Sequence, residues 1–292
     1  MNNVPPEDAV YIVNKPPGPT SFAQVASLRR LLGIKKAGHA GTLDPDASGI
    51  LIVLTGQATR AAKFFEGLDK EYLAGIKLGV TTDTYDLSGQ VLSTVAVPDL
   101  SRTEIKLALK NFQGQIMQAP PAFSAIKKDG QPLYKAARQG KPVELVPRQI
   151  EIQWIKLKQI TLPEITVSVK CSKGTYIRSL AFDLGKILGC GAALSGLIRT
   201  AVGEFTIDRA VPGDSGKEQL AAAAISIDQA LYFIESLELT SDRAQRIGHG
   251  NPVDCAHPDA GQVKARYQDQ ILAIGPVQNH VFKPQTVLAP QC

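Results

Sequence analysis

The chain has 292 residues, 44% of them apolar and 20% charged, with 32 Lys and Arg against 27 Asp and Glu. This composition excludes a mainly disordered chain and can fill one large domain, alone or with a small companion. No aliphatic run is longer than Ile50–Leu54, which excludes a membrane span, and the first residues do not resemble a secretory signal. We therefore expect a cytoplasmic protein.

The cysteines and histidines do not indicate a disulfide framework or a metal centre. No two cysteines have the C-x-x-C spacing of redox and metal sites. The nearest approach to a metal cluster is His249, Cys255 and His257, whose flanking prolines fit an ordinary loop better. We expect no bound metal and, because no cofactor motif occurs, no cofactor.

Positive charge is concentrated in the middle of the chain. Residues 101–178 contain 14 Lys and Arg against 5 Asp and Glu, a net charge of +9, whereas residues 237–292 contain 5 of each. A segment this basic suits a phosphate-rich partner, because each cation placed on a phosphate releases a condensed counterion. Charge alone leaves open the alternative of a solvated basic face.

The N-terminal third predicts short elements around a glycine-rich loop. Residues 10–13 form an apolar strand, and a helix begins at Thr20 or Ser21 and ends at Gly33. The apolar stripe of that helix is Phe22, Val25, Leu28 and Leu32. Residues 37–49 hold three glycines, one proline and two aspartates, and we expect a loop there.

The apolar pattern continues with alternating strands and helices. In chain order it predicts a buried strand over 50–54, a helix over 57–65, a strand over 72–80, a polar turn over 81–89 and a helix after Ser101. Residues 114–147 form a Pro-, Gly- and Lys-rich excursion with one short helix near 133–139. Residues 165–171 alternate as a half-buried strand. The change of phase at Trp154 and Ile155 predicts either a bulge or a two-sided strand over 150–157.

The last third changes texture near residues 237–241. Helices are predicted over 179–188, 193–198 and 225–235, followed by short strands over 262–267, 271–274 and 281–288. Because strands and helices mix without a regular βαβ rhythm, the fold class is α+β. The final strands indicate a small all-β appendage of roughly fifty residues.

Two positions suggest chemistry on residue type alone. Asp44 lies between glycines and a proline, where a tight turn can present a carboxylate to a substrate, although Asp-Pro is also common in plain β-turns. With Asp46 it also allows a phosphatase-type pair that would need Mg²⁺. Arg178 follows a turn at a predicted helix start, where its guanidinium can bind a carboxylate or phosphate or remain a surface arginine.

Several motifs together resemble one family. The run GHAGTLDPDASG from Gly38 to Gly49 resembles the catalytic signature of the TruB family, the bacterial tRNA pseudouridine-55 synthases. Further blocks agree in the same order: 14–21, 70–72 with 78–89, 120–127 with its continuation to 140, 174–178 and 197–205. These blocks span residues 14–205, and their order makes the resemblance specific.

The resemblance implies a fold and a domain division. The expected architecture is a mixed, largely antiparallel sheet flanked by helices, forming a catalytic domain over 1–238 with a basic RNA-binding insertion at about 114–147. Residues 239–292 would form a PUA-like RNA-binding domain. The expected partner is the T stem-loop of tRNA, and we expect a monomer that needs no membrane.

The resemblance also implies a reaction and its residues. Asp44 would be the nucleophile that isomerises a flipped-out uridine, detaching the base at N1 and rejoining it at C5. Arg178 would pair with Asp44 and favour its ionised form, while Tyr72 would pack on the uracil and help remove the C5 proton. We expect Asp46 to face solvent, because a second negative charge facing inward would oppose the ionisation of Asp44.

Other motif residues would serve binding. His39 would occupy stacking space near the position that the flipped base leaves. Lys15 would support the site, and Leu197 would form an apolar wall of the pocket. Asp86 would also belong to the substrate-binding residues. Lys127 and Lys128, with Lys135, Arg138 and Lys141, would form a basic arm that closes over the RNA. A non-catalytic tRNA-binding or tRNA-folding protein on the same scaffold is the alternative, followed by the metal-dependent phosphoryl hydrolase.

Overall fold

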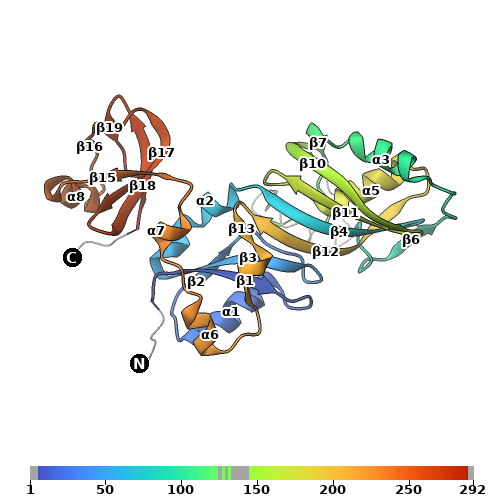
Figure 1. Ribbon diagram of the computed structural model, residues 1–292, viewed down its shortest axis with the longest axis horizontal. Helices are drawn as coiled ribbons and strands as arrows, with labels where there is room; N and C mark the ends of the chain where they lie inside the picture. The colour runs from blue at the N-terminus through green and yellow to red at the C-terminus, as the bar shows by residue number, and fades with distance from the viewer. Residues whose placement is uncertain (1–5, 124–126, 129–130, 133–144, 289–292) are drawn as a thin grey trace. The chain divides into compact units, whose positions relative to one another are not determined.

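A computed structural model of the chain describes all residues except 1–5, 124–126, 129–130, 133–144 and 289–292 (Figure 1). The chain divides into two compact units. The first unit contains residues 1–45, 51–66 and 209–292, and the second contains 46–50 and 67–208. None of the helices within the described ranges is long and apolar enough to span a membrane.

The second unit is built on an antiparallel sheet in the order β12-β4-β11-β10-β7. These strands are β4 (Lys70–Leu78), β7 (Gly114–Gln118), β10 (Arg148–Thr161), β11 (Glu164–Cys171) and β12 (Ala192–Val202). The first residues of β3 (Ser48–Thr55) pair in parallel with β12, and β13 (Phe205–Thr206) pairs back onto it. Alternate residues of β4 and β11 are buried, which places one face of the sheet in the core.

Two helices cover that buried face. Helix α3 (Arg102–Lys110) contributes Ile105, Ala108 and Leu109 to the core, and α5 (Ile177–Ile187) contributes Leu180 and Leu184. Helix α3 begins with a capping box in which Ser101 and Glu104 satisfy each other's main-chain N–H groups. A two-stranded ribbon, β5 (Val80–Thr82) with β6 (Val91–Thr94), carries the turn between its strands.

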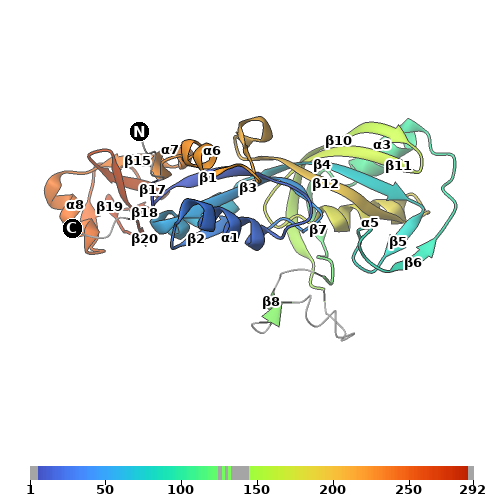
Figure 2. The ribbon, with the colours of Figure 1, turned by 90° about the horizontal axis from the view of Figure 1, so that it is seen from below.

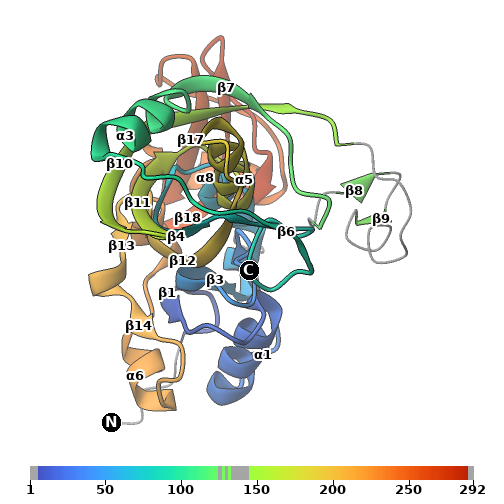
Figure 3. The same ribbon diagram turned by 90° about the vertical axis from the view of Figure 1, so that its right-hand side faces the viewer.

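In the first unit, β1 (Val10–Lys15) pairs in parallel with β14 (Val211–Pro212), and β2 (Ala37–Ala40) pairs antiparallel with β3. Helix α1 (Ser21–Leu32) packs beside α6 (Lys217–Ala222), as Figures 1 and 3 show. Thr20 caps α1 at its start, and Gly33 ends it in the left-handed conformation. Three short helices complete this part: η1 (Gly56–Ala61), α2 (Ala62–Glu66) and α7 (Ile227–Ala230).

The C-terminal residues of the first unit form a separate sheet in the order β15-β17-β18-β19-β16, with β20 paired to β18. Its strands are β15 (Glu235–Glu238), β16 (Val253–Asp254), β17 (Ala260–Tyr267), β18 (Gln270–Gln278), β19 (Val281–Phe282) and β20 (Thr286–Val287). Helix α8 (Ser241–Gly248) packs on it through Ala244 and Ile247. The prediction that this appendage is all-β was therefore wrong, because the amphipathic helix α8 shares the core of its sheet.

The elements with strong periodicity were predicted correctly. The α+β class with a mixed, largely antiparallel sheet is confirmed, as are β1, α1, β3, β11, α3 and α5. The bulge expected near Trp154 is also confirmed, since the register of β10 against β11 shifts between Ile152 and Trp154. In the basic excursion, β8 (Lys127–Lys128), labelled in Figure 2, pairs with β9 (Gln131–Pro132), and both are labelled in Figure 3. The helix expected near 133–139 lies outside the described residues.

Three predictions within the first unit were wrong. Phe22 is 78% exposed and does not belong to the core stripe of α1, because the buried face runs one position earlier through Ser21, Val25 and Leu28. Residues 37–40, expected as part of a loop, form β2 because β3 offers them a pairing edge. The helix expected over 225–235 is reduced to the four residues of α7, and the last predicted residue, Glu235, starts β15.

Other predictions failed for related reasons. Residues 193–198 form part of β12, because pairing with β4 overrides the helical preference of an Ala- and Leu-rich sequence. Residues 114–118, expected in the irregular excursion, form edge strand β7, and the helix expected over 57–65 is split between η1 and α2. The strand expected over 281–288 is divided into β19 and β20.

Candidate active site

The carboxylate candidate, Asp44, lies on a loop whose base is held by a buried lysine. Lys15 ends β1 with its side chain fully buried, and its Nζ donates to the carbonyl oxygens of Pro16, Pro19 and Pro45 at 2.7, 2.9 and 3.0 Å. An ammonium group has three N–H donors, and burial without acceptors would cost several kcal/mol. The proline-rich loop after β1 is therefore tied to the residue next to Asp44.

The other side of the loop is held by α1. Ser21 accepts a hydrogen bond from the N–H of Leu43 at 2.9 Å and donates its hydroxyl to the carbonyl of Leu43 at 3.0 Å. Gly18 donates its N–H to the carbonyl of Pro45 at 2.9 Å. Both neighbours of Asp44 are thus fixed by groups of the same unit, and Asp44 itself is half-buried. Asp46 is exposed, which confirms the expectation that it faces solvent.

His39 lies on a strand rather than on the loop itself. It belongs to β2, opposite Val53 of β3, and is half-buried. The chain turns away from the strand two residues later at Gly41, which has a φ of +81° that suits glycine. His39 is therefore presented by a paired element at the entrance to the Asp44 loop.

Tyr72 and Leu197 lie on neighbouring strands of the second unit. Tyr72 of β4 is opposite Arg199 of β12, and Leu197 is opposite Ala74, so the register makes Tyr72 and Leu197 diagonal neighbours on one face. Tyr72 is buried at the margin of the core and Leu197 packs against the same core. This pair can form an apolar wall that carries one phenol group.

Arg178 is a buried cation with a prepared set of acceptors. It is the second residue of α5, is 7% exposed, and donates through Nη1 to the carbonyl of Thr84 at 3.2 Å and through Nη2 to that of Phe123 at 3.1 Å. The Asp86 carboxylate lies 3.7 Å from Nη1. Asp86 in turn accepts from the hydroxyls of Thr84 and Ser88 at 2.7 and 2.6 Å. The turn between β5 and β6 therefore fixes the guanidinium.

A ring stack that the sequence did not predict braces this turn. Tyr85 has a φ of +65°, unusual for a bulky residue, and its ring stacks on Phe182 with centroids 3.9 Å apart and planes 12° apart. Phe182 follows Arg178 by one helical turn, and the Nζ of Lys186 lies over the Phe182 ring, 4.1 Å from its centroid. Burial, with the Asp183 carboxylate, raises the pKa of Tyr85, which therefore stays a neutral phenol.

Two further buried side chains position the strands and helix of this unit. Gln118 accepts from the N–H of Tyr176 at 2.8 Å and donates to its carbonyl at 3.0 Å, which anchors the start of α5 to β7. Arg199 donates through Nε to the carbonyl of Ile50 at 2.7 Å. Gly49 packs so closely on the Arg199 main chain that a Cβ would collide with its carbonyl oxygen, which explains glycine at the end of the signature.

The predicted site residues divide between the two units. Asp44, His39 and Lys15 lie in the first, whereas Tyr72, Arg178, Leu197 and Asp86 lie in the second. The ion pair expected between Asp44 and Arg178 stays a prediction. Lys127 and Lys128 form β8, while Lys135, Arg138 and Lys141 lie outside the described residues. Among the described residues, no group of three His, Cys, Asp or Glu side chains could hold a metal ion.

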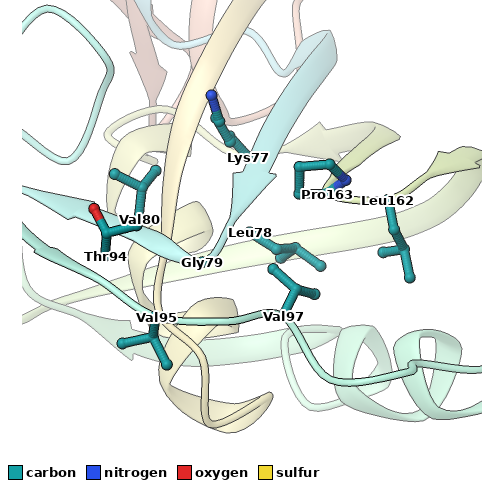
Figure 4. Close-up of a pocket in the computed structure, with 9 residues that line it drawn as sticks. All are labelled: Lys77, Leu78, Gly79, Val80, Thr94, Val95, Val97, Leu162 and Pro163. Carbon is teal, nitrogen blue, oxygen red and sulfur yellow. The ribbon is translucent and has the colours of Figure 1, made fainter.

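A separate cavity of about 530 Å³ lies in the second unit, where β4 meets β5 (Figure 4). Its lining is mostly apolar and comes from Lys77–Val80, Thr94, Val95, Val97, Leu162 and Pro163. None of the predicted site residues lines it, and Lys77 is its one ionisable side chain. The cavity offers no carboxylate, imidazole or thiol for chemistry.

Comparison with known proteins identifies the family. A family model described as TruB family pseudouridylate synthase (N terminal domain) matches residues 29–177. A protein named tRNA pseudouridine synthase B from Opitutus terrae is 48% identical over 208 residues, covering 71% of this chain and 86% of that protein. The chain belongs to the TruB family of pseudouridylate synthases. The resemblance inferred from the motifs is thus confirmed.

Further relatives extend the match to 97% of the chain. A tRNA pseudouridine synthase B from an Azoarcus species is 38% identical over 288 residues, covering 97% of this chain and 96% of that protein. Among solved structures, a Cbf5-Nop10-Gar1 complex includes a chain with a TM-score of 0.75 and 25% identity, covering 97% of this chain and 86% of that one. An H/ACA ribonucleoprotein bound to a substrate RNA gives a TM-score of 0.74 at 23% identity, which supports the fold alone.

Proposed function

We propose that this enzyme converts uridine 55 in the T-loop of tRNA to pseudouridine, with Asp44 as the nucleophile. The observation that carries the proposal is the Asp44 loop. Its two flanking residues are anchored by Lys15 and Ser21, so the carboxylate stands on a rigid base within the signature shared with the family. Relatives named tRNA pseudouridine synthase B support tRNA as the substrate.

The reaction is an isomerisation in which every atom of the nucleotide is retained. The bond between C1′ and N1 breaks, the uracil turns, and a bond between C1′ and C5 forms while the C5 proton moves to a nitrogen. The carboxylate of Asp44 attacks C6 of the base or C1′ of the sugar, or assists the formation of a glycal, and each route requires it to be ionised. A nearby guanidinium favours that form, which is the role proposed for Arg178.

The remaining residues receive roles that match their surroundings. Asp86 and the two carbonyl groups hold the Arg178 guanidinium in one orientation. Tyr72 and Leu197 form the wall on which the flipped uracil packs, with Tyr72 assisting removal of the C5 proton. His39, held on β2, occupies the space left in the RNA stack. Lys15 holds the loop and does not touch the reacting atoms.

Recognition of tRNA is proposed to rest on charge and shape. Lys127 and Lys128 start the basic arm within the region of +9 net charge, which suits the phosphates of the T stem-loop. We also propose that residues 239–292 act as a PUA-like RNA-binding domain, that the enzyme works as a monomer, and that it acts in the cytoplasm.

The test compares two neighbouring aspartates. Wild type, Asp44→Asn and Asp46→Asn are incubated with unmodified tRNA under single-turnover conditions, and the digested nucleosides are analysed by mass spectrometry for carbon-linked uridine at position 55. We expect Asp46→Asn to retain turnover, because Asp46 is exposed, and Asp44→Asn to bind tRNA without forming product. Turnover by Asp44→Asn would remove Asp44 from the mechanism.

The wild-type result separates the alternatives. Binding and refolding of tRNA without any base isomerisation would favour the non-catalytic protein. Phosphate release from a generic ester that EDTA abolishes would favour the metal-dependent hydrolase. Pseudouridine at another position of the tRNA would keep the enzyme class and replace the proposed target.

A further inference from the structure

The outward side of α1 carries an exposed aromatic side chain. Phe22 is 78% exposed, the highest value among the exposed large apolar side chains of the described residues. It follows Thr20, the helix cap, and Ser21, which binds Leu43 of the Asp44 loop. An aromatic ring left in water beside a candidate active site forgoes the favourable free energy that burial would provide.

The same side of the helix continues into positive charge. Ala26, Arg29 and Arg30 follow Phe22 at intervals of four, seven and eight residues, which places them along one side of an α-helix. Both arginines are exposed, and at 1.5 Å of rise per residue they lie about 10–12 Å along the axis from Phe22. Lys35 and Lys36, also exposed, follow the end of the helix. Phe22, Arg29, Arg30, Lys35 and Lys36 are called the α1 surface below.

The charge of the α1 surface is not neutralised within its neighbourhood. Residues 9–43 contain five Lys and Arg and no Asp or Glu. Within the described parts of the chain, Arg29, Arg30, Lys35 and Lys36 take part in no ion pair. The helix dipole accounts for cations in the last turn, since positive charge is favourable there. It does not account for the exposed ring or for the two lysines beyond the helix.

We propose that the α1 surface is a docking site for the substrate RNA, which deepens and rests on the proposed function. An unpaired base stacks on Phe22, and the phosphates that follow lie over Arg29, Arg30, Lys35 and Lys36. Aromatic rings bind bases without regard to sequence, and guanidinium groups match phosphate geometry. Because Ser21 links α1 to the Asp44 loop, RNA held on this surface is held in register with that loop.

The first test removes the ring without disturbing the core. Phe22→Ala, Phe22→Leu and Phe22→Trp are compared with wild type for tRNA affinity and for the single-turnover rate at saturating tRNA. We expect alanine and leucine to weaken binding roughly fivefold or more and tryptophan to preserve it, because stacking requires a ring. The rate at saturating tRNA should fall by a smaller factor than the affinity. Equal affinity for all four proteins would overturn the stacking role.

The second test removes charge and includes a matched control. The double variant Arg29→Ala/Arg30→Ala is compared with Arg209→Ala/Lys217→Ala, which loses the same charge from exposed positions of the same unit. We expect Arg29→Ala/Arg30→Ala to make the negative slope of log affinity against log salt less steep, by about 0.7–0.9 for each phosphate that is no longer neutralised. The control pair should leave the slope unchanged. Equal slopes for both variants would overturn the proposed binding of phosphates by Arg29 and Arg30.

The outcomes distinguish this inference from the proposed function. Wild-type pseudouridine formation with α1 variants that behave like the control would reject the docking site and leave the reaction intact. Absence of pseudouridine in the wild type would reject the reaction, whatever the binding results. A photoreactive phenylalanine analogue at position 22 should crosslink to tRNA; crosslinking to a protein instead would assign the α1 surface to a protein partner and overturn the inference.

Discussion

Two buried lysines of the first unit, Lys15 and Lys264, make the same kind of contact with main-chain carbonyl groups but hold different segments. Lys15 donates to three carbonyl groups around the Asp44 loop. Lys264 of β17 is 6% exposed and donates to the carbonyls of Asp228 and Leu231 at 3.2 and 3.3 Å, while the Asp228 carboxylate lies 2.8 Å away. In both places a buried ammonium group donates hydrogen bonds to main-chain carbonyl groups outside the regular hydrogen bonding of helices and strands.

The difference lies in what each lysine holds. Lys15 fixes a loop that presents a half-buried carboxylate. Lys264 fixes α7 against the C-terminal sheet, within an ion network in which Arg266 reaches Asp228 at 3.1 Å and Glu238 at 2.8 Å. A buried cation is therefore no sign of catalysis by itself. Its importance for the reaction depends on the segment whose backbone it organises.

Replacing Lys15 should have the largest effect. In Lys15→Met the three carbonyl groups lose their donor while the side chain keeps its length, so we expect the free energy of unfolding to fall by about 3–5 kcal/mol. Single-turnover activity should fall with it, even at temperatures where the protein remains folded. Urea unfolding and the rate on tRNA measure the two effects. A stable, fully active variant would show that the loop holds its own shape.

Replacing Asp228 should separate stability from activity. Asp228→Asn leaves Lys264 and Arg266 without their shared carboxylate, and we expect a loss of about 1–3 kcal/mol in the free energy of unfolding, since the carboxylate is partly exposed. The single-turnover rate at saturating tRNA should not change. Asp269→Asn is the control, because that fully exposed carboxylate lies 3.9 Å from Arg266 and should have no measurable effect. A lower rate in Asp228→Asn would contradict the division of roles.

The comparison also explains which parts of the molecule the sequence predicts. Strands and helices with a clear apolar period, such as β11 and α3, follow from local pattern and capping residues. The Asp44 loop was recognisable because glycine, proline and aspartate stand together in one short run. Strand β12 was not predicted, because its Ala- and Leu-rich sequence becomes a strand only when β4 supplies hydrogen bonds.

The supporting residues of the site were harder still. Lys15 was found through a motif, but its contact with the carbonyl of Pro45, 30 residues away, depends on how two separate loops meet. Gln118, which anchors the start of α5 from 58 residues away, carries no local signal at all. The stack of Tyr85 on Phe182 likewise joins two elements far apart in the chain. Long-range polar and ring contacts are set by tertiary structure, which local periodicity does not encode.

Arg178 extends the comparison to the second unit, where the segment holding the cation is itself braced by Tyr85. Tyr85→Ala removes the stack on Phe182 and keeps a strained φ, so we expect a loss of about 1–2 kcal/mol in the free energy of unfolding. Tyr85→Gly also removes the stack but relieves the strain of the positive φ, so its loss in the free energy of unfolding should be smaller. Tyr85→Phe should match wild type. If alanine and glycine are equivalent, the positive φ carries no strain.

In both Tyr85 variants that lack the ring, the turn that carries Asp86 should hold Arg178 less firmly. We expect the single-turnover rate to fall more than tRNA affinity, because the affected groups lie at the proposed reaction centre rather than on the basic arm. Tyr85→Phe provides the matched control, since it preserves the ring stack. A loss of affinity with an unchanged rate would assign this turn to RNA docking instead.

Cys171 shows the opposite case, a buried group that stays uncharged. Burial raises the pKa of its thiol to about 12, so it should resist alkylation at pH 8.5 in the folded protein. Because the folded pKa lies above the unfolded value, the thiol's contribution to stability is complete below pH 9 and is lost between pH 9 and 12. Relative to Cys171→Ala, the free energy of unfolding of the wild type should fall by up to about 1.4 kcal/mol per pH unit between pH 9 and 12. Urea unfolding of wild type and Cys171→Ala at several pH values measures this difference. The titration of Tyr11 and Tyr85 cancels, because both proteins contain these residues. If the free energies of unfolding of the two proteins change in parallel with pH, the thiolate is solvated in the fold.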